Sequence, residues 1–165
     1  MSTQKELSKM ENAVIVHGTL YLLTAREVCW KCRAEQLVVA LATQRLSDEG
    51  SPVEHTNDDL VVLSDIVEMP AEVFSYLRQR NPGFESRYSN TAGHSYFSNT
   101  CECGALFGDH YLHSEPGAAF FPESKEEAAK ITLSSIPVPP PLKFDCVCHY
   151  GSVGELILGH ARRLS

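Results

Sequence analysis

Two cysteine pairs, far apart in the sequence, constrain the fold of this chain more than any other feature. Residues 29–32 read Cys-Trp-Lys-Cys and residues 101–104 read Cys-Glu-Cys-Gly. A short turn can aim two sulfur atoms at one point about 2.3 Å away, so two such turns supply the four thiolates of a closed tetrahedral zinc site. We therefore predict a structural Zn²⁺ held by Cys29, Cys32, Cys101 and Cys103, which requires two distant segments to fold against each other.

Composition and context favour metal binding over disulfides. The six cysteines could form three disulfides, but they lie in tight pairs, and residues 1–12 are polar and charged rather than a signal peptide, so we expect a cytoplasmic protein. The chain has 165 residues, 43% hydrophobic and 21% charged, as in one soluble globular domain, and no apolar run is long enough to span a membrane. We predict a flexible N-terminal tail over residues 1–12 and a single zinc-stabilised domain over residues 13–165.

A third cysteine pair, Cys146 and Cys148, has two readings. On a strand the two side chains point to the same face. They could replace one of the other pairs at the zinc, or fill the core beneath the last helix as small hydrophobic residues, which is the favoured interpretation. A disulfide between them is disfavoured, because next-but-one residues of a regular strand lie near or beyond the usual disulfide span.

Hydrophobic patterning predicts an α+β fold with an antiparallel sheet, a zinc-ribbon-like double knuckle and packed helices. Residues 13–23 and 37–43 are rich in β-forming residues and flank the first cysteine pair. Residues 87–99 predict a hairpin that delivers the second pair to the first. We predict further strands over 60–66 (which Asp65 could end early), 131–133 and 143–150, a polar loop over 47–59, a strand or short helix over 105–113, and helices over 71–80, 123–130 and 152–164, the last packed on the sheet.

The segment containing Asp109, His110 and His113 is the strongest candidate for a catalytic site. If the segment is helical, the two histidines share a side and could bind a metal or move a proton with Asp109. If it is extended, they face opposite ways. Because the chain has no zinc-protease glutamate, phosphate-binding loop, dinucleotide fingerprint or nucleophile elbow, we expect a non-catalytic protein and keep a metal-dependent hydrolase as the weaker alternative.

Charge favours a protein partner over a nucleic acid. The chain carries 14 basic and 21 acidic residues, a net charge of −7, which opposes the approach of a phosphate backbone. A nucleic-acid-binding zinc-ribbon regulator is therefore the rival interpretation. Tyr88, His94, Tyr96 and Phe97 precede the second cysteine pair and could form an aromatic surface for a partner, although alternate members of such a run commonly belong to a sheet core.

Three stretches of this sequence resemble a group of uncharacterised bacterial proteins with a paired-cysteine, zinc-ribbon-like core. They are residues 29–32, 88–91 and 96–109, and the relatives often have Cys-x-x-Cys-Gly where this chain has Cys-x-Cys-Gly. The resemblance implies a bacterial origin and a metal-binding role for the four cysteines, and gives no catalytic residue. We predict a non-catalytic, zinc-stabilised protein-binding module, of the immunity or antitoxin type, in which a small acidic domain covers a basic site on another protein.

Overall fold

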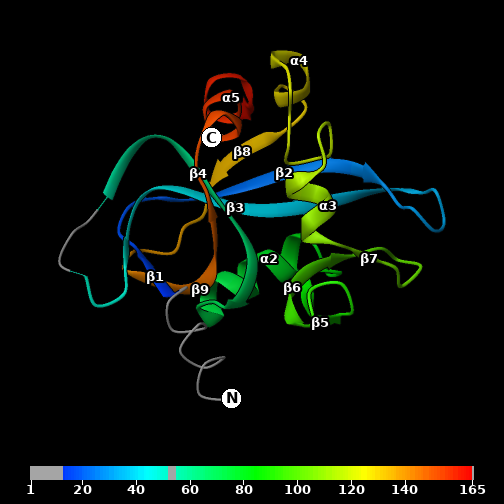
Figure 1. Ribbon diagram of the computed structural model, residues 1–165, viewed down its shortest axis with the longest axis horizontal. Coiled ribbons are helices and arrows are strands. Elements are labelled where there is room, and N and C mark those ends of the chain that lie inside the picture. The colour runs from blue at the N-terminus through cyan, green and yellow to red at the C-terminus, as the bar shows by residue number, and fades with distance from the viewer. Residues whose placement is uncertain (1–12, 52–54, 165) are drawn as a thin grey trace.

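The computed structural model describes residues 13–51 and 55–164, which form a mixed α+β fold of one ten-stranded sheet and four helices (Figure 1). The tail predicted over residues 1–12 lies outside the described residues. The strands are β1 (Ala13–Val16), β2 (Leu20–Val28), β3 (Glu35–Asp48), β4 (His55–Glu68), β5 (Glu85–Ser89), β6 (His94–Thr100), β7 (Leu106–Phe107), β8 (Thr132–Ser135), β9 (Leu142–His149) and β10 (Arg162–Arg163). The helices are α2 (Ala71–Arg80), α3 (Asp109–Ser114), α4 (Lys125–Ala128) and α5 (Ser152–His160).

The sheet closes on itself through its longest strands. The strand order is β10-β8-β2-β3-β1-β9-β4-β6-β5, with β7 added to β6 and with β3 also paired to β4. Strands β3, β1, β9 and β4 therefore form a closed ring, from which β2 and β8 extend on one side and β6 and β5 on the other. The described pairings are antiparallel except for β10 with β8, in agreement with the predicted class.

Both faces of the central strands are buried, which explains their continuous apolar runs. Along β3, Val39 and Leu41 enter one apolar cluster, whereas Val38, Ala40 and Ala42 enter a second cluster on the opposite face. Helix α2 packs on the first cluster, and α3 and α5 pack on the second. Figure 1 shows the same layering, with α2 below the β2–β3 pair and α4 and α5 above it.

Helix α5 lies unusually close to the sheet because Gly154 faces strand β4. A Cβ atom at residue 154 would lie 1.8 Å from the carbonyl oxygen of Leu60, so no side chain fits there. The glycine allows Ile157, one turn further on, to be fully buried in the second cluster. The predicted C-terminal helix is thus present, although it ends at His160 and the chain continues into β10 rather than remaining helical to residue 164.

The loop predicted over residues 47–59 is wrong at both ends. Strand β3 continues to Asp48 because β1 pairs with its end, with Val14 opposite Asp48, and β4 begins at His55 because its start pairs with β3, with His55 opposite Leu46. These pairings supply backbone partners to polar residues that have no hydrophobic pattern. The single strand predicted over 13–23 is likewise divided into β1 and β2. None of the helices among residues 13–51 and 55–164 is long and apolar enough to cross a membrane.

Candidate metal centre and adjoining cleft

The fold brings the four predicted cysteines together. Their sulfur atoms all lie within 4.8 Å of one another, with Cys29 Sγ 3.7 Å from Cys103 Sγ and Cys32 Sγ 3.5 Å from Cys101 Sγ. Sulfur ligands 2.3 Å from a central ion in a tetrahedron lie about 3.8 Å apart. The four thiols are free of disulfides, so the set is compatible with a four-coordinate metal ion.

Two turns of similar design present these sulfurs. The first connects β2 to β3 and is closed by hydrogen bonds from Cys29 N to Ala34 O and from Arg33 N to Cys29 O. The second connects β6 to β7 and is closed by Cys101 N to Ala105 O and Gly104 N to Cys101 O, with Gly104 at a φ of 93° that glycine adopts without strain. In each turn the first cysteine is buried and the second is exposed.

Backbone N–H groups of the first turn favour the thiolate form of Cys29. The N–H of Cys32 lowers the pKa of Cys29 to about 6, the N–H of Lys31 adds to the effect from 3.4 Å, and burial opposes it. Near the second turn, the N–H of Cys103 lowers the pKa of Cys101, but burial and the neighbouring thiols outweigh it and raise that pKa to about 12. The cluster thus already has one thiol that ionises readily, and a divalent ion would ionise the others.

A buried asparagine fixes the position of the second turn against the first hairpin. Asn99 lies two residues before Cys101 and is only 2% exposed. Its Oδ1 accepts from Val39 N at 2.9 Å and its Nδ2 donates to Val39 O at 3.0 Å, so the amide pairs with β3 as a neighbouring strand would. Asn81 donates to the same Oδ1 at 3.2 Å and to Leu37 O at 3.0 Å. These contacts tie β6, β3 and the end of α2 together beneath the four cysteines.

The third cysteine pair does not join the metal centre. Cys146 is buried in the first apolar cluster, and Cys148 packs against that cluster. Neither belongs to the group of four sulfurs, which is the one set of three or more potential ligands found among the described residues. The pair therefore fills the core, as in the favoured interpretation, but it lies in the first cluster, whereas the last helix, α5, packs on the second cluster.

Beside the metal centre lies an open cleft of about 800 Å³. Its walls come from the two cysteine turns through Trp30 and Leu106, the β5–β6 hairpin, helix α3, and strands β4 and β9. Two hydrogen bonds hold these walls together: Trp30 Nε1 donates to Leu106 O at 3.0 Å and joins the first cysteine turn to β7, and Arg87 Nη1 donates to Gly104 O at 2.9 Å and joins β5 to the second turn. The cysteine turns and the cleft are therefore parts of one structure.

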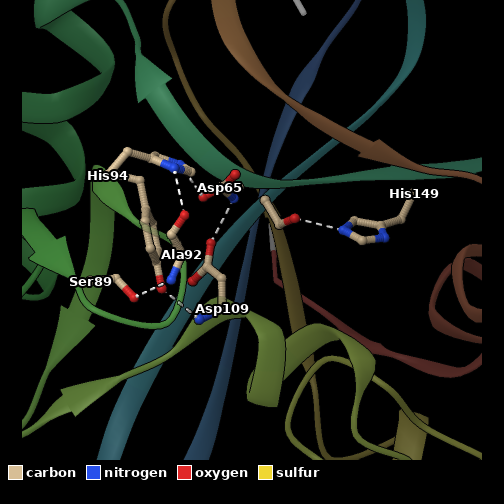
Figure 2. A network of polar contacts seen from close by, with 8 residues as sticks. Asp65, Ser89, Ala92, His94, Asp109 and His149 are labelled. Carbon is tan, nitrogen blue, oxygen red and sulfur yellow. Dashed lines mark hydrogen bonds and ion pairs between the residues drawn. The ribbon is translucent and has the colours of Figure 1, made fainter. Parts of the chain in front are cut away.

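The cleft contains a polar network assembled from three elements (Figure 2). Asp65 of β4 accepts from His94 Nε2 through Oδ1 at 3.0 Å, and its own N–H donates to Asp109 Oδ2 at 2.8 Å. The N–H of Asp109 donates to the Tyr96 hydroxyl at 3.0 Å. His94 Nδ1 lies 3.2 Å from Ala92 O. Both partners of the His94 ring nitrogens are oxygen acceptors.

Asp65 has an uncommon backbone conformation, and Asp109 has a raised pKa. Asp65 has a φ of 50°, a left-handed conformation that is uncommon outside glycine, where the pairing register of β4 and β9 shifts. Burial raises the pKa of Asp109 to about 7; the hydrogen bond from Asp65 N opposes this, and the charge of the Asp65 carboxylate adds to it. Strained backbone and strongly shifted carboxyl groups concentrate at functional sites.

The three predicted catalytic residues all line the cleft but do not form a group of metal ligands among the described residues. Their segment is helical, which is the alternative in which the two histidines could act together. However, His110 is exposed on the cleft wall while His113 is buried. His113 stacks on Phe120 and on His149, and burial lowers its pKa to about 3, so it is neutral. No group of three or more possible ligand atoms within the described ranges includes Asp109, His110 or His113.

The aromatic run before the second cysteine pair divides between surface and core. Tyr88 is 62% exposed at the cleft, whereas Tyr96 is buried, with its hydroxyl in the polar network. Phe97 packs against Phe74 and Phe84 in the first apolar cluster. Sequence reasoning missed Asp65, Arg87 and His149 as cleft residues; the signal available was a carboxylate directly after the buried run of β4. Comparison with protein-family models, with curated protein sequences and with solved structures gives no match.

Proposed function

We propose that this chain is a non-catalytic protein-binding module whose four-cysteine centre holds a structural Zn²⁺ in a zinc-ribbon-like pair of turns. The partner binds in the cleft beside the metal. The observation that carries the proposal is the pair of hydrogen bonds from Trp30 and Arg87, by which the metal turns hold the cleft wall in place. A structural metal in this position fixes a binding surface that the short β6–β7 hairpin could not fix alone.

The ligand set supports zinc in a structural role. Four thiolates in tetrahedral arrangement are typical of Zn²⁺, and they leave no coordination position for water or substrate. Iron is the other ion that four thiolates commonly hold, so metal analysis must distinguish the two. Four unpaired cysteines on neighbouring turns are also in keeping with the reducing cytoplasm that we propose as the location.

Exposed aromatic side chains support protein binding. Trp30, Tyr88 and Tyr111 are 64%, 62% and 47% exposed, and all three line the cleft. Tyrosine and tryptophan are enriched at protein interfaces and supply much of their binding free energy. With a net charge of −7, the domain suits a partner with a basic surface, as an immunity or antitoxin protein that covers another protein's basic site would require.

Photocrosslinking in cells of the source organism tests this function. Benzoylphenylalanine in place of Tyr88 is expected to give a discrete covalent adduct with one protein, because residue 88 lies on the cleft rim. The matched control places the same photoreactive residue at Leu164, which is 52% exposed and does not line the cleft. Equal adducts from both positions, or adducts with nucleic acid alone, would contradict the proposal.

A further inference from the structure

The cleft contains a carboxyl group that has no cationic partner. Asp109 Oδ2 accepts one hydrogen bond, from Asp65 N, and within the part of the chain that the structure describes its Oδ1 accepts none. No lysine, arginine or histidine of these residues forms an ion pair with it. A largely buried carboxyl group beside a second carboxylate is costly to ionise without a counter-charge. A ligand that carries a positive charge would supply the counter-charge that Asp109 lacks.

Two basic side chains of the cleft, His94 and Arg87, already have other hydrogen-bond partners. His94 binds Asp65 Oδ1 and Ala92 O through its two ring nitrogens. Arg87 donates to Gly104 O in the second cysteine turn. A metal ion is disfavoured as the counter-charge, because Asp109 does not belong to any group of three ligand atoms in the described chain. The free acceptor therefore suits an organic cation.

The cleft that contains this carboxyl group is also lined by exposed aromatic side chains. Trp30 comes from the first cysteine turn, Tyr88 from β5 and Tyr111 from α3, so the three rings approach the cleft from three separate elements. Of the four large aromatic side chains that are strongly exposed among residues 13–51 and 55–164, these three line the cleft and Tyr150 does not. Aromatic faces attract organic cations, and the attraction strengthens when water is displaced.

We propose that the cleft receives an arginine side chain of the protein partner, with its guanidinium group hydrogen-bonded to Asp109 and flanked by the rings of Trp30, Tyr88 and Tyr111. The inference rests on the protein-binding function proposed above and names the chemistry that the partner presents. Arginine fits better than lysine because a planar guanidinium group stacks on aromatic rings and presents several N–H donors to a carboxylate at once. The cleft, at about 800 Å³, has the size of a site that encloses a whole side chain.

A peptide titration tests the inference on the zinc-loaded full chain. The probe is an acetylated and amidated pentapeptide with one central arginine flanked by glycine and serine. Its control carries citrulline, which has the same shape without the charge. The chain has one tryptophan, so the Trp30 indole N–H gives a single NMR signal that reports on the rim of the cleft. We expect saturable shifts of this signal and of the Asp65 and Asp109 amides, and affinity for citrulline at least about tenfold weaker.

Variants assign the binding to the cleft. Asp109→Asn retains an oxygen for the Asp65 N–H but removes the charge, and should weaken arginine-peptide binding by about tenfold. Tyr88→Ala removes an exposed ring and should weaken it severalfold. Asp58→Asn is the matched control: it removes the same charge from an exposed residue of β4 that does not line the cleft, and should leave the affinity unchanged.

The outcomes separate this inference from the protein-binding function. Equal binding of the citrulline or lysine peptide, absence of saturable shifts at millimolar peptide, or unchanged affinity in Asp109→Asn would each overturn the arginine site. If the crosslink from residue 88 still forms with undiminished yield in Asp109→Asn, the arginine inference fails while the binding function stands. If the crosslink from residue 88 does not form even with Asp109 intact, the binding function fails, and the arginine inference that rests on it fails too.

Discussion

We expect the buried side chain of Asn99 to contribute substantially to the stability of the fold. The change Asn99→Ala removes three hydrogen bonds, two to Val39 of β3 at 2.9 and 3.0 Å and one from Asn81 at 3.2 Å. It also leaves the N–H and C=O of Val39 without partners. Because residue 99 is only 2% exposed, water does not readily replace the lost amide.

The magnitude follows from these contacts. Each hydrogen bond contributes about 1 kcal/mol net, and each buried backbone group left unsatisfied costs about 1–3 kcal/mol. The two estimates cannot be added in full, because both include the hydrogen bonds between Asn99 and Val39. The expected loss in the free energy of unfolding is therefore about 3–5 kcal/mol. Because Asn99 also sets the register of β6 two residues before Cys101, the variant should bind zinc more weakly than the parent chain.

Urea unfolding of the zinc-loaded protein, followed by circular dichroism, measures the loss in the free energy of unfolding. Competition with a chelator measures the change in zinc affinity. Asn90→Ala provides the control, because Asn90 is exposed in the β5–β6 turn and should change the free energy of unfolding by less than about 0.5 kcal/mol. A loss below about 1 kcal/mol in Asn99→Ala would refute the reasoning, since it would mean that Val39 finds other partners.

Three further predictions concern the metal, the packing of α5 and the titration of the cleft. The purified chain should carry close to one zinc ion, and Cys29→Ser should lose both the ion and the cooperative thermal transition, as measured by metal analysis and calorimetry; a metal-free parent chain of unchanged melting temperature would contradict this. Gly154→Ala should destabilise the fold by at least about 2 kcal/mol, because the new Cβ meets the Leu60 carbonyl oxygen, whereas Gly159→Ala, where nothing lies within 4 Å, should be tolerated. Because the pKa of Asp109 is raised in the folded state to about 7, folding favours the protonated acid, and its unfavourable contribution is absent well below pH 4 and complete above pH 7. The stability of Asp109→Asn relative to the parent chain should therefore rise between about pH 4 and pH 7 and level off above that, in urea titrations with excess zinc; a constant difference would show that Asp109 does not titrate in this range.

The spacing of neighbouring residues was sufficient to predict several elements of this fold. The helix over residues 71–80 was predictable because Pro70 precedes it and Asn81-Pro82-Gly83 follows it, and its bounds agree with α2. The two cysteine pairs and the hairpin between residues 87 and 99 were predictable for a similar reason. A turn that presents two sulfurs, or one that reverses a strand, is specified by neighbouring residues. The α+β class and the four clustered cysteines therefore follow from the sequence by itself.

Tertiary structure alone decided how β3 is used and which residues line the cleft. The ring of β3, β1, β9 and β4 depends on pairings between segments far apart in the chain, so the polar end of β3 was mistaken for a loop. Asp65, His94 and Asp109 come from three different elements, and no local pattern connects them. His110 and His113, which are close in sequence and both line the cleft, differ in burial because His113 stacks on Phe120 and His149 whereas His110 is exposed. Burial and long-range hydrogen bonding determine this strand pairing and the residues that line the cleft, and both depend on the assembled fold.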